Sequence, residues 1–263
     1  MKANSEHPLF AEERREQILR LLHENMKIMV PELCELFGVS PATIRGDLRD
    51  LEAEGKLRRT HGGAIPVSKI GFEPDSNMKE IEHIEEKQRI AACACSMIED
   101  GDTIALDTGT TTMELAKLLP EKKNLTIVTN DIQIAAFLET NAASNVILIG
   151  GMLRRGFHCT TGSMAVKELS ALNVDKAFLA SNAFTVKNGF TTPTFEQAEV
   201  KRVMLSISSL NIVLLDSSKL GRITFLKFAD VSDVDRIVTD NGVSRKMLAA
   251  IREANESATV YTV

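Results

Sequence analysis

The chain has 263 residues, 44% of them hydrophobic and 25% charged, so its composition excludes an intrinsically disordered protein and its length accommodates one small and one medium domain. No apolar run approaches the roughly 20 residues that span a bilayer, and the charged residues 1–16 exclude a secretory signal, so we expect a cytoplasmic protein without membrane contact. The net charge is −5, and residues 1–66 carry ten Lys or Arg against eleven Asp or Glu, which excludes nucleic-acid binding through global basicity.

Two helices are predicted first along the chain. Within residues 12–25, Ile18 and Leu22 recur at helical spacing, and Arg14 is expected on the opposite face, toward solvent. A second, shorter helix with an apolar face is predicted over residues 30–37.

A third helix follows almost at once. Gly38 tolerates the left-handed backbone that ends a helix. Ser40 is a typical N-cap and Pro41 fits the first helical position, so the third helix begins at Pro41. Two helices joined by so tight a turn predict a helix-turn-helix.

The third helix has the pattern of a recognition helix. Ile44, Leu48 and Leu51 recur at i, i+4 and i+7 and are expected to face inward. Short, polar or cationic side chains on the other face suit a helix in the major groove, where arginine reads guanine or holds phosphate. The expected DNA contacts from this part are Ser40, Ala42, Thr43, Arg45 and Arg49.

Residues 55–64 are predicted to form a wing. Gly55 stops the helix, Leu57 anchors a strand, and residues 61–63 form a turn. Its cations can touch phosphate or a minor groove, and Arg58, Arg59 and His61 complete the expected DNA contacts. The alternative is a solvated, charged hairpin.

This region resembles the DNA-binding domain of the DeoR family of bacterial sugar-metabolism regulators. The resemblance is carried by Arg14, Ile18, Leu33, Leu36, Phe37, Val39, Ser40, Thr43, Ile44, Arg45, Asp47, Leu48, Leu51, Glu52, Gly55, Leu57, Arg59, His61, Gly62, Gly63 and Ala64. The family usually has Thr-Ile-Arg-Arg-Asp-Leu in the third helix, whereas this chain has Gly46 in place of the second arginine. We therefore expect an operator contact that differs from the family's.

Residues 66–77 hold Pro66, Gly71 and Pro74 without a sustained apolar period, which predicts an interdomain connection, and a long helix is expected from about Met78. The expected domains are a winged helix-turn-helix over 1–66, a linker over 67–79 and an effector-sensing α/β domain over 80–263. That domain alternates strands and helices, which favours a mostly parallel sheet. Its predicted strands are 103–106, 125–129, 146–149, 176–180, 212–215 and 236–239.

Ligands of parallel sheets bind beyond the carboxyl ends of the strands, and polar loops follow four of these strands. The first, Asp107–Thr112, leads into a helix and combines a glycine with hydroxyls, which predicts a phosphate cradle. The alternative is a Thr-rich helix cap without a ligand. The expected effector-binding residues are Asp107, Thr108, Gly109, Thr110, Thr111, Thr112, Asn130, Gly150, Gly151, Arg154 and Lys219.

This half resembles the DeoR sensor domain through residues 107–111, 129–130, 150–151, 161–162 and 175–178, the Glu199-x-Lys201 pair, and residues 216–221. The resemblance implies a fold like that of ribose-5-phosphate isomerase and the CoA transferases, and a phosphorylated sugar that changes operator affinity. The family commonly shows Gly-Ala-x-Gly where this chain has residues 180–184, Ala-Ser-Asn-Ala-Phe.

The sequence thus predicts a DNA-binding transcriptional regulator, a repressor of a sugar-metabolism operon, that acts as a homodimer or higher homo-oligomer on a double-stranded operator. One alternative is a phosphosugar isomerase-like enzyme with an accessory DNA-binding domain. For that enzyme Asp107, Glu199 and Asp216 are possible bases, but each has a plainer role. A purely structural assembly domain is the third hypothesis. The four cysteines form no CxxC pair, and no metal or cofactor is expected.

Overall fold

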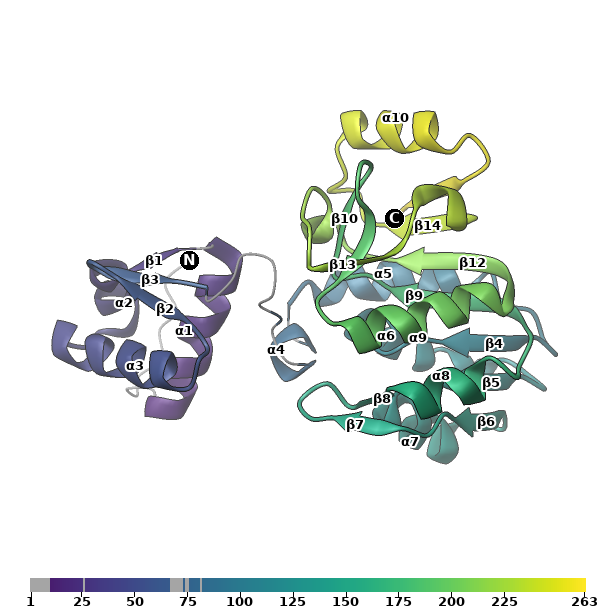
Figure 1. The fold of residues 1–263 in the computed structure, drawn as a ribbon, viewed down its shortest axis with the longest axis horizontal. Coiled ribbons are helices and arrows are strands. Elements are labelled where there is room, and N and C mark those ends of the chain that lie inside the picture. The colour runs from purple at the N-terminus through teal and green to yellow at the C-terminus, as the bar shows by residue number, and fades with distance from the viewer. Residues whose placement is uncertain (1–9, 26, 67–72, 74–75, 81) are drawn as a thin grey trace. The chain divides into compact units, whose positions relative to one another are not determined.

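The computed structural model describes residues 10–25, 27–66, 73, 76–80 and 82–263. The chain divides into two compact units, Met1–Pro74 and Asp75–Val263, which are described separately below and drawn in Figure 1. The expected linker, residues 67–79, lies mostly outside the described residues, and its last residues belong to a helix, α4 (Ser76–Glu80).

The first unit is a helix-turn-helix with a β-hairpin wing. Its elements are α1 (Ala11–Asn25), β1 (Ile28–Met29), α2 (Val30–Phe37), α3 (Pro41–Ala53), β2 (Arg58–Thr60) and β3 (Gly63–Ile65). The turn between α2 and α3 has the predicted geometry, because Gly38 is left-handed with φ of 64° and the Ser40 side chain caps α3 by accepting from the Thr43 amide. The strands form one antiparallel sheet in the order β1-β3-β2.

The core of this unit differs from the sequence expectation at Leu36, which belongs to the apolar face predicted for residues 30–37 and is 57% exposed, and at Arg14. Ile18, Ile44 and Leu48 are fully buried, as expected. Arg14, expected in solvent, is only 8% exposed. Its guanidinium donates to both carboxylate oxygens of Asp47 in α3, at 2.6 and 3.2 Å. The pair joins α1 to α3 inside the core, and a buried charge is tolerated there because its hydrogen bonds are satisfied.

The second unit is a three-layer α/β/α sandwich. Its sheet has seven parallel strands in the order β15-β14-β12-β9-β4-β5-β6. These strands are β4 (Thr103–Leu106), β5 (Thr126–Thr129), β6 (Asn145–Leu148), β9 (Val174–Ala180), β12 (Ser208–Leu214), β14 (Arg236–Thr239) and β15 (Thr259–Thr262). In Figure 1, α8 and α9 lie in front of this sheet and α5 and α6 lie behind it.

Each face of the sheet has its own apolar layer. The helices on one side are α5 (Ile84–Cys95), α6 (Thr110–Ala116) and α7 (Ile132–Asn141), and those on the other are α8 (Ser163–Leu169), α9 (Phe195–Ser206) and α10 (Arg245–Ala254). Ile90 and Leu115 belong to the first layer, and Phe184 and Met204 to the second. None of the described helices is long and apolar enough to cross a membrane.

The six predicted strands all belong to this sheet, and four smaller features were not predicted. They are the last strand β15, the hairpin of β7 (Met152–Arg154) and β8 (Cys159–Thr161), the sheet of β10 (Ala183–Thr185), β11 (Gly189–Thr192) and β13 (Leu226–Ala229), and three short 3-10 turns. The prediction of a single long helix from about Met78 is wrong. It is broken into α4 and α5 at His83, whose backbone is left-handed with φ of 52°.

Candidate DNA-binding surface and effector site

The recognition helix α3 presents the predicted face to solvent. Ala42, Thr43, Arg45 and Arg49 are all exposed. The hydroxyls of Ser40 and Thr43 lie 2.9 Å apart, so the turn before the helix is ordered by its own side chains. A Cβ placed on Gly46 would meet no atom within 4 Å. Packing therefore does not require glycine here, and its effect is confined to the outer surface of the helix.

The wing is fastened to α3 by an ion pair. The Nε of Arg59 donates to Glu52 at 2.6 Å, and the backbone amide of Arg59 donates to the other oxygen of that carboxylate at 2.8 Å. These bonds hold the pKa of Glu52 below its usual value. Arg59 therefore sets the angle of the wing, and part of its charge is already neutralised.

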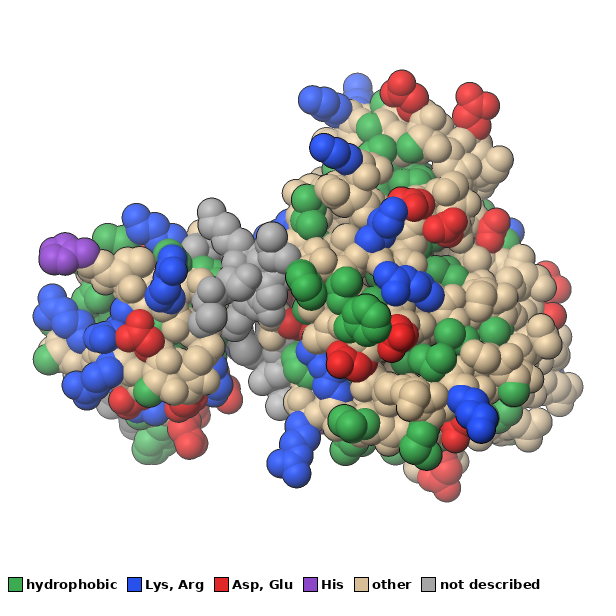
Figure 2. All heavy atoms as spheres, in the orientation of Figure 1, with side chains coloured by type: hydrophobic (Ala, Val, Ile, Leu, Met, Phe, Trp, Pro, Cys, Tyr) green, Lys and Arg blue, Asp and Glu red, His purple; other side chains and the backbone are tan. Residues whose placement is uncertain are grey.

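A groove of about 430 Å³ lies between α3 and the wing, and both sides contribute to its lining. Arg45 comes from the helix, and Thr60 and His61 come from the wing. Figure 2 shows several Lys and Arg side chains on the visible face of this unit, with Asp and Glu side chains at its centre and lower edge. The face that carries the recognition helix therefore has a local cationic surface, which the net charge of the chain did not predict.

In the second unit, the carboxyl ends of β4, β5, β6 and β12 lie at one edge, because these strands are parallel members of one sheet. The four predicted loops therefore share that edge. Within the first loop, Thr112 is fully buried and its hydroxyl donates to the Gly109 carbonyl at 2.8 Å, and Thr111 is 7% exposed. Thr108 and Thr110 remain partly accessible, so they are the hydroxyls of this loop that a ligand can reach.

Asp107 is paired with a lysine that sequence reasoning did not place in the site. One carboxylate oxygen, Oδ2, accepts from Lys201 of α9 and from the Ala180 amide, while Oδ1 is buried with no hydrogen-bond partner among the described residues. Lys201 and Asp107 are 2% and 1% exposed. The resemblance to the sensor domain includes Lys201, but only the fold brings it to Asp107. Oδ1 is left as an acceptor for an incoming hydroxyl.

A second acceptor lies after the neighbouring strand. The Asn130 side-chain amide donates to the Thr160 carbonyl at 2.9 Å, and its oxygen is buried and has no hydrogen-bond partner in the described part of the chain. Asp131 caps α7 and accepts from Thr108 at 2.6 Å. Burial raises the pKa of Asp131, and the charge of Asp107 adds to this. The two loops are thereby joined through Thr108.

The third loop is built around two glycines. A Cβ on Gly151 would lie 2.6 Å from the Thr161 carbonyl oxygen, so no larger residue fits there without a shift. The Gly150 amide is occupied by Glu168 at 2.8 Å, which removes it from the donors expected for an effector. Arg154 stacks its guanidinium on the Phe157 ring, 3.5 Å from the ring centroid.

Cations gather at the carboxyl end of β12. Lys219 lies 3.9 Å from Asp216, which caps its own loop by accepting from the Ser218 amide. Burial opposes ionisation of Asp216, but Lys219, Ser218, His83 and Lys87 outweigh it and lower the pKa. Lys87, which the sequence did not single out, is 3% exposed. Burial first and the charge of Lys219 second lower the pKa of Lys87 to about 8.

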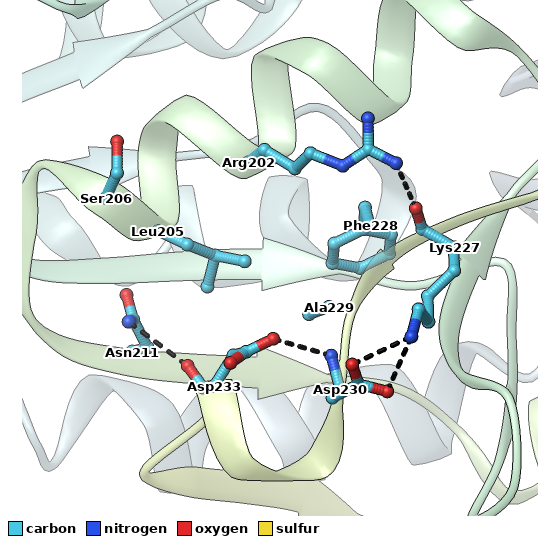
Figure 3. A pocket seen from close by; sticks show the side chains of 9 residues that line it. All are labelled: Arg202, Leu205, Ser206, Asn211, Lys227, Phe228, Ala229, Asp230 and Asp233. Carbon is cyan, nitrogen blue, oxygen red and sulfur yellow. Dashed lines mark hydrogen bonds and ion pairs between the residues drawn. The ribbon is translucent and has the colours of Figure 1, made fainter.

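A separate pocket of about 560 Å³ lies elsewhere, by the amino end of β12 and the carboxyl end of α9 (Figure 3). Its polar groups are bonded to one another: Arg202 donates to the Lys227 carbonyl, Lys227 pairs with Asp230 at 2.8 Å, and Asn211 donates to the Asp233 carbonyl at 3.2 Å. Asn211 Oδ1 is buried without a hydrogen-bond partner among the described residues, but the other polar groups are bonded to one another. We do not assign the effector to this pocket, because it lies by the amino end of β12 and ligands of parallel sheets bind beyond the carboxyl ends.

A helix-turn-helix with an exposed recognition face, followed by an α/β unit with acceptors and cations at its strand ends, defines a transcription regulator with a sensor domain. The DeoR-like helix-turn-helix family matches residues 14–69, and the DeoR C-terminal sensor domain family matches residues 82–241. The chain belongs to the DeoR family of transcriptional regulators.

Full-length relatives agree with this assignment. The HTH-type transcriptional regulator GlpR of Haloferax volcanii is 37% identical over 95% of this chain and 96% of its own. The transcriptional repressor AccR of Agrobacterium fabrum is 34% identical over 92% of this chain and 94% of its own. A ribose-5-phosphate isomerase from Methanocaldococcus jannaschii aligns over 53% of this chain and 55% of its own with 16% identity and a TM-score of 0.40, too low to add support. GlpR and AccR are named as regulators, so the isomerase alternative is set aside.

Proposed function

We propose that the protein represses a sugar-metabolism operon and that a phosphorylated sugar bound at the carboxyl edge of the second unit changes its affinity for the operator. The observation that carries this proposal is the pair of buried acceptors without partners among the described residues, Asp107 Oδ1 and Asn130 Oδ1. On the same sheet edge lie the cations Lys219 and Lys87. Buried acceptors without a hydrogen-bond partner suit sugar hydroxyls, and two neighbouring cations suit a phosphate.

We assign the effector to the polar groups that meet at this edge. The direct contacts proposed are Asp107, Thr108, Gly109, Thr110, Asn130, Gly151, Arg154, Lys219 and Lys87. Thr111, Thr112 and Gly150 support the loops. A thermal-shift screen of the full chain with sugar phosphates, inorganic phosphate and the unphosphorylated sugars tests this. Stabilisation by at least one sugar phosphate, above that by its sugar, is expected, and no shift with any of them would refute the effector class.

The DNA contacts are proposed to come from Ser40, Ala42, Thr43, Arg45, Arg49, Arg58 and His61, with Arg59 positioning the wing. Arg45→Ala should weaken binding to an operator, selected by the protein from random duplexes, by about 10- to 100-fold, because one arginine–guanine pair is worth about 1–3 kcal/mol. Fluorescence anisotropy measures the loss. The control is Arg252→Ala, an exposed arginine of α10, which should bind as wild type. Equal binding by Arg45→Ala would show that the recognition face is wrongly assigned.

We propose that two copies act together, because a helix-turn-helix protein reads two half-sites with two recognition helices. The edge strand β6 supports this. Ile147 and Leu148, which point to opposite faces of the strand, are 41% and 47% exposed, and Met152 and Leu153 of the next hairpin are 77% and 49% exposed. An uncharged, apolar sheet edge is normally covered. A sedimentation measurement of the operator complex that found one chain per site would contradict the proposal.

The buried Lys87 predicts a pH dependence of effector binding. An anion bound beside Lys87 favours the charged form, so it raises the pKa of Lys87 above its value of about 8 in the free protein. Affinity should therefore be constant somewhat below pH 8 and fall as the pH rises above 8, by at most about tenfold per pH unit. Calorimetric titrations at pH 7 and 9 measure this. The Lys87→Met variant should bind the effector more weakly at pH 7, and its affinity should be the same at pH 7 and pH 9. A wild-type affinity that is equal at both pH values would exclude Lys87 from the site.

A further inference from the structure

The helix α4 is held against the effector site through the β7–β8 loop. The Ser76 amide, at the start of α4, donates to the Gly156 carbonyl at 2.9 Å. The Lys79 ammonium lies 5.5 Å from the centroid of the Phe157 ring. Lys87 of α5 donates to the Lys79 carbonyl and to the Glu82 carbonyl. These contacts attach α4 to the β7–β8 loop on one side and to a buried cation of the site on the other, and α4 also lies against α6.

Phe157 also contacts two of the proposed effector ligands, although it is not itself one of them. The same ring carries the guanidinium of Arg154 at 3.5 Å, so it makes cation–π contacts with two different cations. Its carbonyl oxygen lies 3.4 Å from the Thr108 hydroxyl, whose single hydrogen is donated to Asp131 at 2.6 Å. The following residue, His158, accepts from the Ile132 amide at 2.8 Å. Phe157 thus contacts Arg154 and Thr108, which are proposed effector ligands, and also α4.

These contacts compete with an effector. A phosphate within reach of Arg154 draws the guanidinium away from the ring, because a charge-assisted hydrogen bond is stronger than a cation–π contact. A ligand oxygen at Thr108 also displaces the long contact between this hydroxyl and the Phe157 carbonyl. Withdrawal of Arg154 from the ring lets Phe157 shift, and the Ser76 and Lys79 contacts of α4 shift with it.

We propose that Phe157 is the positioning residue that couples the effector site to α4, the first described helix after the DNA-binding unit. A ligand shifts operator affinity only if its contacts differ between two arrangements, and the Arg154–Phe157–Lys79 stack supplies an arrangement that the free protein has and the bound protein loses. The coupling rests on the effector assignment proposed above, whereas the hold of Phe157 on α4 does not.

The hold on α4 is tested without any ligand, by hydrogen–deuterium exchange of the full chain. Phe157→Leu keeps an apolar side chain but removes both cation–π contacts. The amide of Ser76, bonded to Gly156, should exchange at least about tenfold faster in this variant. Phe157→Tyr should exchange as wild type, because it keeps the aromatic face. Phe225→Leu, at a 68% exposed position, is the matched control. Unchanged exchange of Ser76 in Phe157→Leu would overturn the proposal.

The coupling is tested with the sugar phosphate that gives the largest thermal shift, or with inorganic phosphate if none exceeds it. Wild type should lose operator affinity at saturation by a factor within the ~5- to 150-fold range of allosteric couplings. Phe157→Leu should bind that compound within about threefold of wild type, but its operator affinity should change much less when the compound is bound. Phe157→Tyr should show the wild-type change in operator affinity. If the compound lowers the operator affinity of Phe157→Leu as much as that of wild type, the coupling is contradicted. If no phosphate compound binds wild type, the effector assignment and the coupling fail together, and exchange at Ser76 still decides the hold on α4.

Discussion

Lys201→Met is expected to destabilise the sensor unit by about 3–5 kcal/mol, the cost of leaving one member of a buried ion pair without its partner. Lys201 and Asp107 are almost completely buried, and the lysine also donates to the Ala180 carbonyl at 2.9 Å. Methionine keeps the length of the side chain but leaves the Asp107 carboxylate uncompensated. Urea unfolding followed by circular dichroism measures the loss.

The matched control for this variant is Lys227→Met. Lys227 pairs with Asp230 at 2.8 Å, but both side chains are about half exposed, so we expect a loss below about 1 kcal/mol. The double variant Lys201→Met with Asp107→Asn should recover part of the loss, because it removes the unpaired charge. A loss in Lys201→Met no larger than in the control would show that the buried pair does not stabilise this unit.

Asp47→Asn is expected to destabilise the DNA-binding unit by a similar amount, about 3–5 kcal/mol. Asp47 is 3% exposed and accepts from Arg14 and from Arg15, at 2.6 and 3.3 Å, so it joins α1 to α3. Asparagine has the same shape, but it carries no charge and turns an amide group toward one guanidinium. Thermal unfolding followed by calorimetry should show an earlier transition for this unit, with weaker operator binding at temperatures where it begins to unfold.

The neighbouring Asp50 provides the control. Asp50 bonds Arg15 at 2.5 Å, but its side chain is 42% exposed, so Asp50→Asn should cost less than about 1 kcal/mol. If Asp47→Asn and Asp50→Asn were equally mild, α1 would be attached to α3 by apolar packing alone. Asp47→Asn leaves the exposed face of the recognition helix unchanged, so an effect of this variant on DNA binding must come through stability. Asp50 lies 3.9 Å from Arg49, a proposed DNA contact, so Asp50→Asn is a control for stability and not for DNA binding.

The sequence was most informative where a few adjacent residues decide the backbone. The turn at Gly38 and the N-cap Ser40 define the start of α3 by local geometry, and the apolar period of that helix separates its buried face from its DNA-facing face. The alternation of strands and helices likewise predicted the parallel sheet, and with it the edge that gathers the four loops.

The tertiary structure decided which charges are buried and paired. Nothing in the local pattern distinguishes Arg14 from a solvent-facing arginine, because its partner Asp47 lies 33 residues away. Lys201 reaches Asp107 across 94 residues, and the importance of Lys87 depends on Lys219 and Asp216 beside it. Periodicity and capping are local properties of a chain, whereas the environment of a charge depends on residues distant in sequence that only the fold brings together. The family, the domain types and the edge of the sheet could therefore be predicted from local patterns in the chain, whereas the pairing of the charged groups at that edge depends on the fold.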